Sequence, residues 1–266
     1  MQDRFNRNIN YLRISVTDRC NLRCMYCMPA EGIQLLKHEN ILRFEEIIEF
    51  TKIAVKKGID KIRITGGEPL VRKGTVYFIQ ELSKINGIID LSLTTNGVLL
   101  EEYAQGLKDA GLHRINISLD TVDPDKYKEL TRGGDIKQVI KGITSAQEVG
   151  LIPIKINCVV NESADEYDAK SVRDFCERMG LEVRFIHRME LHTGIFSTVE
   201  GGSGGNCKIC NRLRLSSDGN IRPCLFNDLS FNIRDLGAEK ALQMALDAKP
   251  ECGTISKQNK FYEIGG

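Results

Sequence analysis

Short apolar runs alternate with longer segments of helical period over most of the chain. Six runs rich in β-branched residues predict strands at residues 11–16, 61–65, 89–94, 114–119, 152–160 and 182–186. In the segments between them, apolar residues return every three or four positions, which indicates amphipathic helices. Strands that alternate with helices predict successive β–α units and a parallel sheet covered by helices. We therefore assign the chain to the α/β class.

Glycines mark the ends of the predicted helices. The first helix has its apolar residues on one face at positions 47, 50, 51, 54 and 55, and further helices are predicted at residues 99–110, 136–149 and 169–179. A glycine follows each helix, and glycine caps helices because it adopts left-handed backbone angles without strain. The capping glycines are Gly58, Gly111, Gly150 and Gly180.

The pattern changes in the last part of the chain. The sequence GGSGG at residues 201–205 predicts a flexible linker. After it come a cysteine pair, a hairpin that turns at Asp218 and Gly219, and a helix at residues 238–248. We place a domain boundary near residue 195, which divides the chain into an α/β domain over 1–195 and a smaller domain over 196–266.

The composition excludes several classes of protein. Of 266 residues, 41% are hydrophobic and 27% charged, which suits a folded core rather than a disordered chain. Lysine and arginine number 37 against 36 acids, so any anion site must be local rather than a general attraction to nucleic acid or membrane. The N-terminal segment has no apolar signal, and no apolar run approaches the roughly 18 residues of a membrane helix, which predicts a cytoplasmic location.

Nine cysteines are unusual in a reducing compartment, where clustered thiols are more often metal ligands or reactive groups than disulfides. Cys20, Cys24 and Cys27, here called the first cysteine set, follow the first predicted strand, at the end of the sheet where α/β proteins build their sites. Three thiolates suit a [4Fe–4S] cluster with one open iron. A zinc ion with His38 as its fourth ligand is the alternative.

Three further motifs end predicted strands at the same edge of the sheet. The GGEP sequence at residues 66–69 lets the backbone approach a ligand closely, and Glu68 can accept a hydrogen bond from an ammonium group. Thr94 opens the sequence TTNG, and Ser118 ends the fourth strand. By themselves these residues are also typical of a glycine turn and of helix caps. Their place beside the first cysteine set favours a ligand site.

A second cysteine set spans the predicted hairpin and consists of Cys207, Cys210 and Cys224. A zinc ribbon would bring a second cysteine pair, which the sequence lacks, and Cys252 is the remaining fourth ligand, so zinc and an iron–sulfur cluster both stay open. Arg212 and Arg214 lie two residues apart on a predicted strand and share one face. Beside an open metal site this pair predicts a polyanionic ligand, and a solvated hairpin face is the alternative.

The C-x3-C-x2-C spacing, with Tyr26 before the third cysteine, resembles the signature of radical S-adenosylmethionine (SAM) enzymes. The motifs YLRISVTDRCNLRCMYCMP, RITGGEPL, TTNG, INISLD, CNRLRL and the terminal IGG together resemble one subfamily, the GTP 3′,8-cyclases, over nearly the whole chain. The resemblance implies a partial (β/α)6 TIM-type barrel and a small C-terminal domain with a second [4Fe–4S] cluster. It also implies SAM as cofactor and GTP as substrate.

The resemblance further implies a reaction and partners. In that subfamily a 5′-deoxyadenosyl radical removes the ribose 3′ hydrogen of GTP, and the carbon radical attacks C8 of guanine. The product is (8S)-3′,8-cyclo-7,8-dihydroguanosine 5′-triphosphate, on the route to the molybdenum cofactor. Implied partners are an electron donor such as flavodoxin or ferredoxin and a downstream pterin-forming enzyme. Neither nucleic acid nor a membrane is expected, and a homodimer is left open.

Carried over by position, the resemblance gives each motif residue a role. The catalytic cluster is assigned to Cys20, Cys24 and Cys27. The SAM contacts are assigned to Tyr26, Gly66, Gly67, Glu68, Ser118 and Met189. The GTP contacts are assigned to Arg13, Arg63, Thr94, Lys155, Arg212, Arg214, Gly265 and Gly266, of which the arginine pair of the hairpin is also counted as catalytic. The second cluster is assigned to Cys207, Cys210 and Cys224.

Two departures from the subfamily keep rival functions open. The segment between Met189 and the second cysteine set is short, and His187 and Arg188 replace the usual acidic and apolar residues. One rival is a radical enzyme that acts on another nucleotide, a peptide or a maturation target. The other is a zinc-binding scaffold without turnover. Cys158 and Cys176 fall in strand and helix patterns and are predicted to be core residues.

Overall fold

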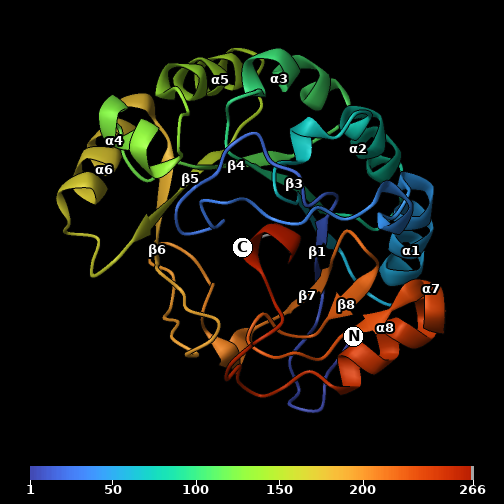
Figure 1. The fold of residues 1–266 in the computed structure, drawn as a ribbon. Helices are drawn as coiled ribbons and strands as arrows, with labels where there is room; N and C mark the ends of the chain where they lie inside the picture. Colours follow the sequence, from blue (N-terminus) through green and yellow to red (C-terminus); the bar gives the residue numbers. More distant parts are fainter. Residues whose placement is uncertain (265–266) are drawn as a thin grey trace.

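Six parallel strands form the first part of a single sheet in the computed structural model, which describes residues 1–264 (Figure 1). They are β1 (Tyr11–Ser15), β2 (Lys61–Thr65), β3 (Asp90–Thr95), β4 (Arg114–Ser118), β5 (Ile154–Val160) and β6 (Glu182–His187). Each strand pairs with the next one along the chain. The α/β class is confirmed, and each predicted strand is found with its ends shifted by at most two residues.

Helices cover the outer face of these strands, as Figure 1 shows. They are α1 (Phe44–Lys56), α2 (Thr75–Ser83), α3 (Leu100–Asp109), α4 (Pro124–Leu130), α5 (Ile136–Glu148) and α6 (Tyr167–Met179). The four predicted helices are confirmed, and Gly180 caps α6 at a φ of +65°. The sequence analysis missed α2 and α4. Helix α4 gives a weak apolar signal because Tyr127 is its one buried residue.

A C-terminal hairpin extends the sheet beyond β1. Strand β7 (Arg212–Leu215) pairs parallel with β1, and β8 (Asn220–Arg222) and β9 (Phe231–Asn232) follow antiparallel. The predicted turn at Asp218 and Gly219 is confirmed. The order β6-β5-β4-β3-β2-β1-β7-β8-β9 leaves β6 and β9 unpaired with each other, so the barrel is partial. The remaining elements are η1 (His38–Asn40), η2 (Pro69–Val71), η3 (Cys207–Ile209), α7 (Ile233–Leu236), α8 (Ala238–Asp247) and α9 (Phe261–Ile264).

The GGSGG sequence forms a hydrogen-bonded turn, so the prediction of a flexible linker was wrong. Val199 N–H donates to the Gly204 carbonyl at 2.8 Å, and Gly202 N–H donates to the Val199 carbonyl at 3.2 Å. Gly205 has a φ of +76°, and a side-chain carbon there would lie 1.8 Å from the Ser197 carbonyl oxygen. Glycine is needed here for close backbone packing rather than for mobility.

The apolar core lies between the sheet and the outer helices. Alternate residues of β1 to β4 are fully buried aliphatics, namely Leu12, Ile14, Ile62, Ile64, Leu91, Leu93, Ile115 and Ile117. The positions between them carry polar side chains, and Arg13 and Arg63 line an internal cavity. The strand period of two thus separates a packing face from a site face. Cys158 and Cys176 are buried in this core, as predicted.

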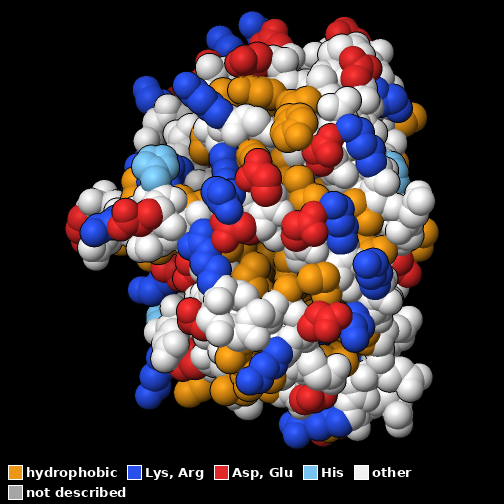
Figure 2. All heavy atoms as spheres, turned by 90° about the vertical axis from the view of Figure 1, so that its right-hand side faces the viewer, with side chains coloured by type: hydrophobic (Ala, Val, Ile, Leu, Met, Phe, Trp, Pro, Cys, Tyr) orange, Lys and Arg blue, Asp and Glu red, His pale blue; other side chains and the backbone are white. Residues whose placement is uncertain are grey.

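The outer surface carries mixed charge. On the face in Figure 2, Lys and Arg side chains are interspersed with Asp, Glu and apolar ones, and neither sign gathers into one patch. This distribution agrees with the near balance of 37 basic and 36 acidic residues. Among residues 1–264, none of the helices combines the length and the apolar character that crossing a membrane requires.

One ion pair ties the C-terminal helices to the barrel. Arg234 of α7 donates from Nε and Nη2 to the two carboxylate oxygens of Glu46 in α1, at 2.8 and 2.9 Å. Its guanidinium also donates to the backbone carbonyls of residues 39–41. The hydrogen bond from Arg234 lowers the pKa of Glu46 from 4.5 to about 2. The folded state therefore favours the ionised carboxylate.

Replacing Arg234 by methionine is expected to destabilise the metal-free protein by about 1 kcal/mol at pH 7, since the pair is partly exposed to water. The contribution of the lowered pKa is present above about pH 4.5 and is lost as the pH falls through about 2. Urea unfolding of both proteins between pH 7 and pH 2 measures this difference.

The control is Lys52→Met, which removes the exposed Lys52–Glu49 pair and should change the free energy of unfolding by less than about 0.5 kcal/mol. Equal losses from the two substitutions at pH 7 would contradict a special role for Arg234.

Candidate functional site

Two adjoining cavities occupy the inside of the barrel. The cysteine cavity, at the carboxyl ends of the strands, has a volume of about 190 Å³ and is defined by Cys20, Cys24, Cys27, Gly66, Gly67 and Ser118. The arginine cavity, toward the amino ends of the strands, has a volume of about 330 Å³. Asn157, Ile186 and Met189 line both cavities. The two cavities therefore adjoin at these three side chains.

The first cysteine set brings three thiols to the cysteine cavity from the loop after β1. The N–H groups of Cys27 and Met28 both donate to the Cys24 carbonyl at 3.0 Å, and Leu22 N–H donates to Cys20 Sγ at 3.4 Å. Burial raises the pKa of the Cys24 and Cys27 thiols to about 12, which disfavours free thiolates. A metal supplies the positive charge that ionised thiols need here. Three thiols that line one cavity have the donor chemistry of a [4Fe–4S] cluster with an open iron, although their sulfur atoms, like all such donors in residues 1–264, are not gathered closely enough here to hold a single metal ion.

Glu68 of the GGEP motif joins two loops behind this cavity, and the described lining does not include it. It is fully buried and accepts hydrogen bonds from Leu70 N–H at 3.0 Å, the Thr95 hydroxyl at 2.8 Å and Asn96 N–H at 2.7 Å. Burial raises the pKa of Glu68 to about 7 against the effect of these bonds. The Asn96 side-chain amide reaches Cys20 Sγ at 3.8 Å. Glu68 thus fixes the loop that touches the first cysteine set.

Gly66, Gly67, Thr94 and Ser118, the other motif residues of the strand ends, do line the cysteine cavity. A side-chain carbon at Gly67 would lie 2.5 Å from the Arg19 carbonyl oxygen, so this close approach of two chain segments requires glycine. The Thr94 hydroxyl is buried and has no hydrogen-bond partner among the described residues. A buried hydroxyl without a partner is costly, so Thr94 is a group that a ligand can satisfy.

Tyr26 lines the cysteine cavity and hydrogen-bonds through its hydroxyl to the carboxylate of Asp120. Val159 N–H donates to the same carboxylate at 2.7 Å. Burial raises the pKa of Asp120 to about 6. Asp120 was not predicted as a site residue. Its place two residues after Ser118, at the carboxyl end of a buried strand, is the sequence signal that indicates it.

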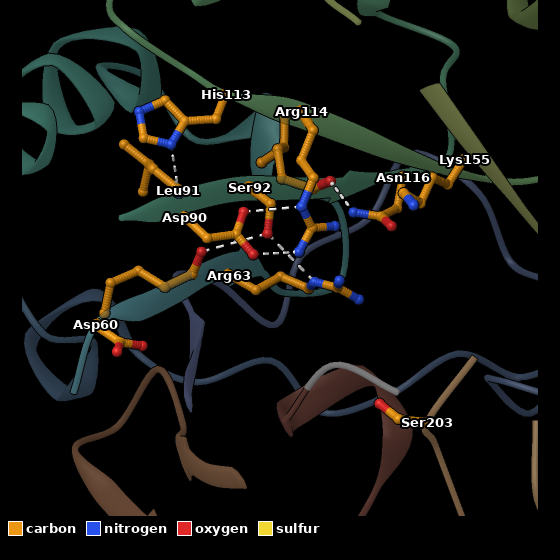
Figure 3. A network of polar contacts seen from close by, with 12 residues as sticks. Asp60, Arg63, Asp90, Leu91, Ser92, His113, Arg114, Asn116, Lys155 and Ser203 are labelled. Carbon is orange, nitrogen blue, oxygen red and sulfur yellow. Dashed lines mark hydrogen bonds and ion pairs between the residues drawn. The ribbon is translucent and has the colours of Figure 1, made fainter. Parts of the chain in front are cut away.

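Seven cationic side chains from five strands line the arginine cavity in the described part of the chain. They are Arg13, Lys61, Arg63, Arg114, Arg184, Arg212 and Arg214. Asp90 is the one carboxylate that lines the cavity among residues 1–264, and Arg114 donates to it from Nε and Nη2 at 2.8 and 2.5 Å (Figure 3). In the same view Arg63 donates to the Ser92 hydroxyl at 3.4 Å. Basic side chains therefore outnumber acidic ones on the described lining of this cavity.

Burial acts against these charges. It lowers the pKa of Arg13 well below 12.5, that of Arg63 to about 10, and also that of Arg214. Nε of Arg184, Nε of Arg214 and Nη1 of Arg114 have no hydrogen-bond partner in the described residues. Buried guanidinium donors gain most from phosphate or carboxylate acceptors. The arrangement is therefore suited to a polyanion.

The second cysteine set lies at the edge of the arginine cavity. Beside it, the buried Lys249 donates from Nζ to two backbone carbonyls at 2.7 and 2.8 Å and to Cys210 Sγ at 3.6 Å. Burial alone would raise the pKa of the Cys210 thiol, but the charge of Lys249 and neighbouring groups lower it overall. Cys252 Sγ lies 3.0 Å from Cys207 Sγ. Within residues 1–264, no three His, Cys, Asp or Glu side chains are grouped to hold a metal ion.

Three predicted GTP contacts are not placed in a cavity. Lys155 forms an ion pair with Glu182, and neither cavity includes it in its described lining. Figure 3 shows Lys155 at the margin of the polar network. Gly265 and Gly266 lie outside the described residues. The other predicted contacts line one of the two cavities, with Thr94 in the cysteine cavity and the four arginines in the arginine cavity.

The residues that depart from the subfamily pattern also face the site. His187 and Arg188 line the cysteine cavity together with Met189. His187 Nε2 lies 3.1 Å from a carboxylate oxygen of Glu200. This contact links β6 to the segment that precedes the GGSGG turn, and the Phe185–Glu200 backbone bridge reinforces it.

Three cations of the arginine cavity were missed in the sequence analysis, namely Lys61, Arg114 and Arg184. Lys61 lies two residues before Arg63, so the strand period puts both on the inner face. Arg114 and Arg184 likewise occupy inward positions in strands whose alternate residues pack outward. Basic residues at alternate positions of buried strands were the signal available in the sequence.

Comparison with known proteins adds independent findings. The model of the Radical SAM superfamily matches residues 14–174. The chain is 40% identical to the GTP 3′,8-cyclase of Petrotoga mobilis, with 100% of both chains covered. It is 42% identical to that of Thermodesulfovibrio yellowstonii over 89% of this chain and 88% of the relative, and 44% identical to that of Peptoclostridium acidaminophilum over 87% and 85%.

Solved structures share the fold at low sequence identity. Streptococcus suis SuiB bound to S-adenosylmethionine matches with a TM-score of 0.69 and 18% identity, over 91% of this chain and 64% of SuiB. The protein anSMEcpe with bound AdoMet matches with a TM-score of 0.64 and 18% identity, over 88% of this chain and 77% of that one. At this identity the likeness concerns the fold alone.

The comparisons confirm the resemblance that the motifs indicated. The superfamily match spans the first cysteine set and the GGEP motif, and it implies SAM and a [4Fe–4S] cluster as cofactors. The relatives cover the second cysteine set as well, since the alignment with the Petrotoga mobilis protein includes the whole chain. The chain therefore belongs to the radical SAM superfamily and, within it, to the GTP 3′,8-cyclase family.

Proposed function

We propose that the chain converts GTP to (8S)-3′,8-cyclo-7,8-dihydroguanosine 5′-triphosphate by a radical cyclisation. The observation that carries this proposal is the arginine cavity, which brings seven cations beside the second cysteine set and adjoins the cysteine cavity. A nucleoside triphosphate matches this arrangement, because its phosphates need many donors and its base needs a separate contact. Relatives named GTP 3′,8-cyclase at about 40% identity support the same substrate.

The cysteine cavity would hold the cofactors of the superfamily. The first cysteine set would bind the [4Fe–4S] cluster, and the contacts to SAM would come from Tyr26, Gly66, Gly67, Glu68, Ser118 and Met189. When bound, these cofactors supply the 5′-deoxyadenosyl radical that removes the ribose 3′ hydrogen. Glu68 keeps the loops after β2 and β3 in place through its three hydrogen bonds and adds a negative charge near an ammonium group.

The triphosphate would bind among the guanidinium groups of the arginine cavity. Arg13 and Arg214 are register partners on the neighbouring strands β1 and β7, so their side chains lie side by side on the inner face of the sheet. Arg184 and Arg214 each bring a buried Nε without a partner in the described residues. Bidentate contacts to phosphate oxygens satisfy such donors and compensate their charge. The ribose would then lie beside Asn157 and Met189, which line both cavities.

We further propose a second [4Fe–4S] cluster on Cys207, Cys210 and Cys224, with its open iron toward the guanine. The thiols line the arginine cavity, and Lys249 lowers the pKa of Cys210, which favours a thiolate ligand. Three thiolates leave one iron for a base nitrogen or oxygen. Arg212 and Arg214 lie between the cysteines in sequence and would hold the substrate next to that iron.

The cellular context remains a proposal as well. Each turnover needs two electrons, one to cleave SAM and one, with a proton, to reduce the nucleotide radical that ring closure leaves. A flavodoxin or ferredoxin of the cytoplasm would supply them, and the product would pass to a pterin-forming enzyme. The boundary near residue 195 would separate the barrel from the segment that bears the second cluster. Strand β7 of that segment adds to the sheet of the barrel, so the two parts share one site.

The direct test is anaerobic incubation of the reconstituted protein with GTP, SAM and a reductant. We expect 5′-deoxyadenosine and the cyclised nucleotide in equal amounts by liquid chromatography and mass spectrometry. A Cys24→Ser control should form neither, because the catalytic cluster loses a ligand. Formation of 5′-deoxyadenosine without any cyclised guanosine product would reject GTP as the substrate.

The arginines provide a second prediction. Arg214→Met removes a buried bidentate donor, and the loss of such a bond, about 1.5–3 kcal/mol, corresponds to a rise in the Kd of GTP of roughly 10- to 150-fold. Calorimetry with GTP measures it, and circular dichroism checks that the variant folds. The matched control is Arg178→Met on the exposed side of α6. An unchanged Kd in Arg214→Met would place the triphosphate elsewhere.

A third prediction concerns pH and SAM. Because burial raises the pKa of Glu68 to about 7, its carboxylate becomes ionised as the pH rises from 6 to 8, and SAM should bind more tightly over this range. Glu68→Gln puts an amide donor against the N–H groups that the carboxylate accepts from, so we expect roughly tenfold weaker binding and a flat pH profile. Calorimetric titration with SAM at pH 6, 7 and 8 decides this. A variant that keeps the wild-type pH dependence would exclude Glu68 as its source.

A further inference from the structure

Two cysteine thiols touch at the margin of the second cysteine set. Cys252 Sγ lies 3.0 Å from Cys207 Sγ. Cys252 is exposed to solvent and Cys207 is half-buried. Cys252 follows α8 and belongs to neither set that the resemblance assigns to a cluster. This close pair therefore has no part in the function proposed above.

The distance argues against a shared metal. Two thiolates on one tetrahedral zinc ion lie about 3.8 Å apart, because each Zn–S bond is about 2.3 Å long. Thiolates on different irons of a cluster lie farther apart still. The observed 3.0 Å is instead about 1 Å longer than the roughly 2.05 Å of a disulfide bond. The observed separation thus lies between the two values, about 0.8 Å below that of two zinc ligands and about 1 Å above a disulfide bond. The thiols are too close for two ligands of one zinc ion, and a small shift would join them.

Arg7 holds the two backbone segments that carry these thiols. Its Nη1 donates to the carbonyls of Cys207 and Glu251, both at 2.8 Å, and its Nη2 donates to the carbonyl of Pro250 at 2.6 Å. The guanidinium is itself buried and paired with the buried Asp3 at 2.7 Å. One fixed cation thus joins the residue before Cys252 to Cys207. The ordering of the two segments is part of the fold, which raises the effective concentration of one thiol at the other.

The Cys252 segment also packs directly on the second set. A side-chain carbon at Gly253 would lie 3.0 Å from Cys224 Sγ, and Gly253 lines the arginine cavity. A change in the bonding of Cys252 is therefore felt at the proposed second cluster.

We propose that Cys207 and Cys252 form a reversible disulfide in the cluster-free protein. The exposed Cys252 thiolate attacks a low-molecular-weight disulfide such as glutathione disulfide, forming a mixed disulfide and releasing one glutathione thiolate. Cys207 then attacks the Cys252 sulfur and releases the second glutathione. Two protein thiols are oxidised to one disulfide, and one glutathione disulfide is reduced to two glutathione thiols.

The disulfide would control when the second set can take up iron. While it is closed, Cys207 has no thiolate to offer and the second set keeps two ligands. Thiol reductants reopen it and restore all three. The disulfide itself is independent of the proposed enzyme activity, whereas its effect on iron uptake rests on the proposed second cluster.

Peptide mapping tests the disulfide in the full-length, cluster-free chain. The reduced protein is treated with glutathione disulfide, quenched in acid, alkylated and digested with trypsin without reductant. Cleavage after Lys208 separates Cys207 from Cys210, so each thiol of the second set leaves in its own peptide. We expect a linked pair of peptides, 189–208 with 241–257. A link from Cys207 to Cys210 or Cys224, or alkylation of both Cys207 and Cys252, would overturn the proposal.

Two variants separate the parts of the proposal. In Cys207→Ser the mixed disulfide cannot be resolved, so Cys252 should retain glutathione, which the wild-type protein should not. Reduced Cys252→Ser should load as much iron as the reduced wild type, about eight per chain, whereas the oxidised wild type should load about four fewer until dithiothreitol is added. Loss of about four irons in reduced Cys252→Ser would make Cys252 a ligand and overturn the proposal. Full iron loading in Cys207→Ser with the linked peptides still present in the wild type would instead refute only the second cluster.

Discussion

The arginine cavity concentrates positive charge inside the barrel. In the part of the chain that the structure describes, seven cations and one carboxylate line it, inside strands whose other face is aliphatic core. Burial lowers the pKa of Arg13, Arg63 and Arg214, which measures the cost of keeping these charges away from water. A polyanion bound in the cavity would offset this cost, so the proposed substrate binding would stabilise the barrel interior. The near-zero net charge of the chain conceals this concentration.

The pairing of β7 with β1 gives the cavity its composition. It sets Arg214 beside Arg13 and brings the second cysteine set to the same space as cations from the barrel strands. Two arginines outside the cavity stabilise this arrangement. Arg7 donates hydrogen bonds to the backbone segments around the second cysteine set, and Arg234 joins α7 to α1 through Glu46. The two proposed cluster sites would therefore face one substrate from different parts of the chain. Neither part contains the whole site.

The sequence predicted the strands and most helices because their apolar periods are regular and their ends are marked by glycines such as Gly180. It also predicted the cysteine sets and the motif arginines, since these depend on local spacing. Lys61 and Arg184 were not predicted as site residues. They lie on β2 and β6, far apart in the sequence, and line the same cavity only because the sheet curves. The sequence could not foresee that Lys155 pairs with Glu182 across two strands, which depends on register. The GGSGG turn was misread because glycine composition does not distinguish mobility from close packing.

The central claim is that the arginine cavity places the ribose of GTP against the cofactor in the cysteine cavity. GTP deuterated at the ribose 3′ position tests this placement in one experiment. The reconstituted protein should transfer the deuterium to 5′-deoxyadenosine, whose mass rises by one unit, while the nucleotide product loses it. Unlabelled 5′-deoxyadenosine formed beside intact deuterated GTP would contradict the account.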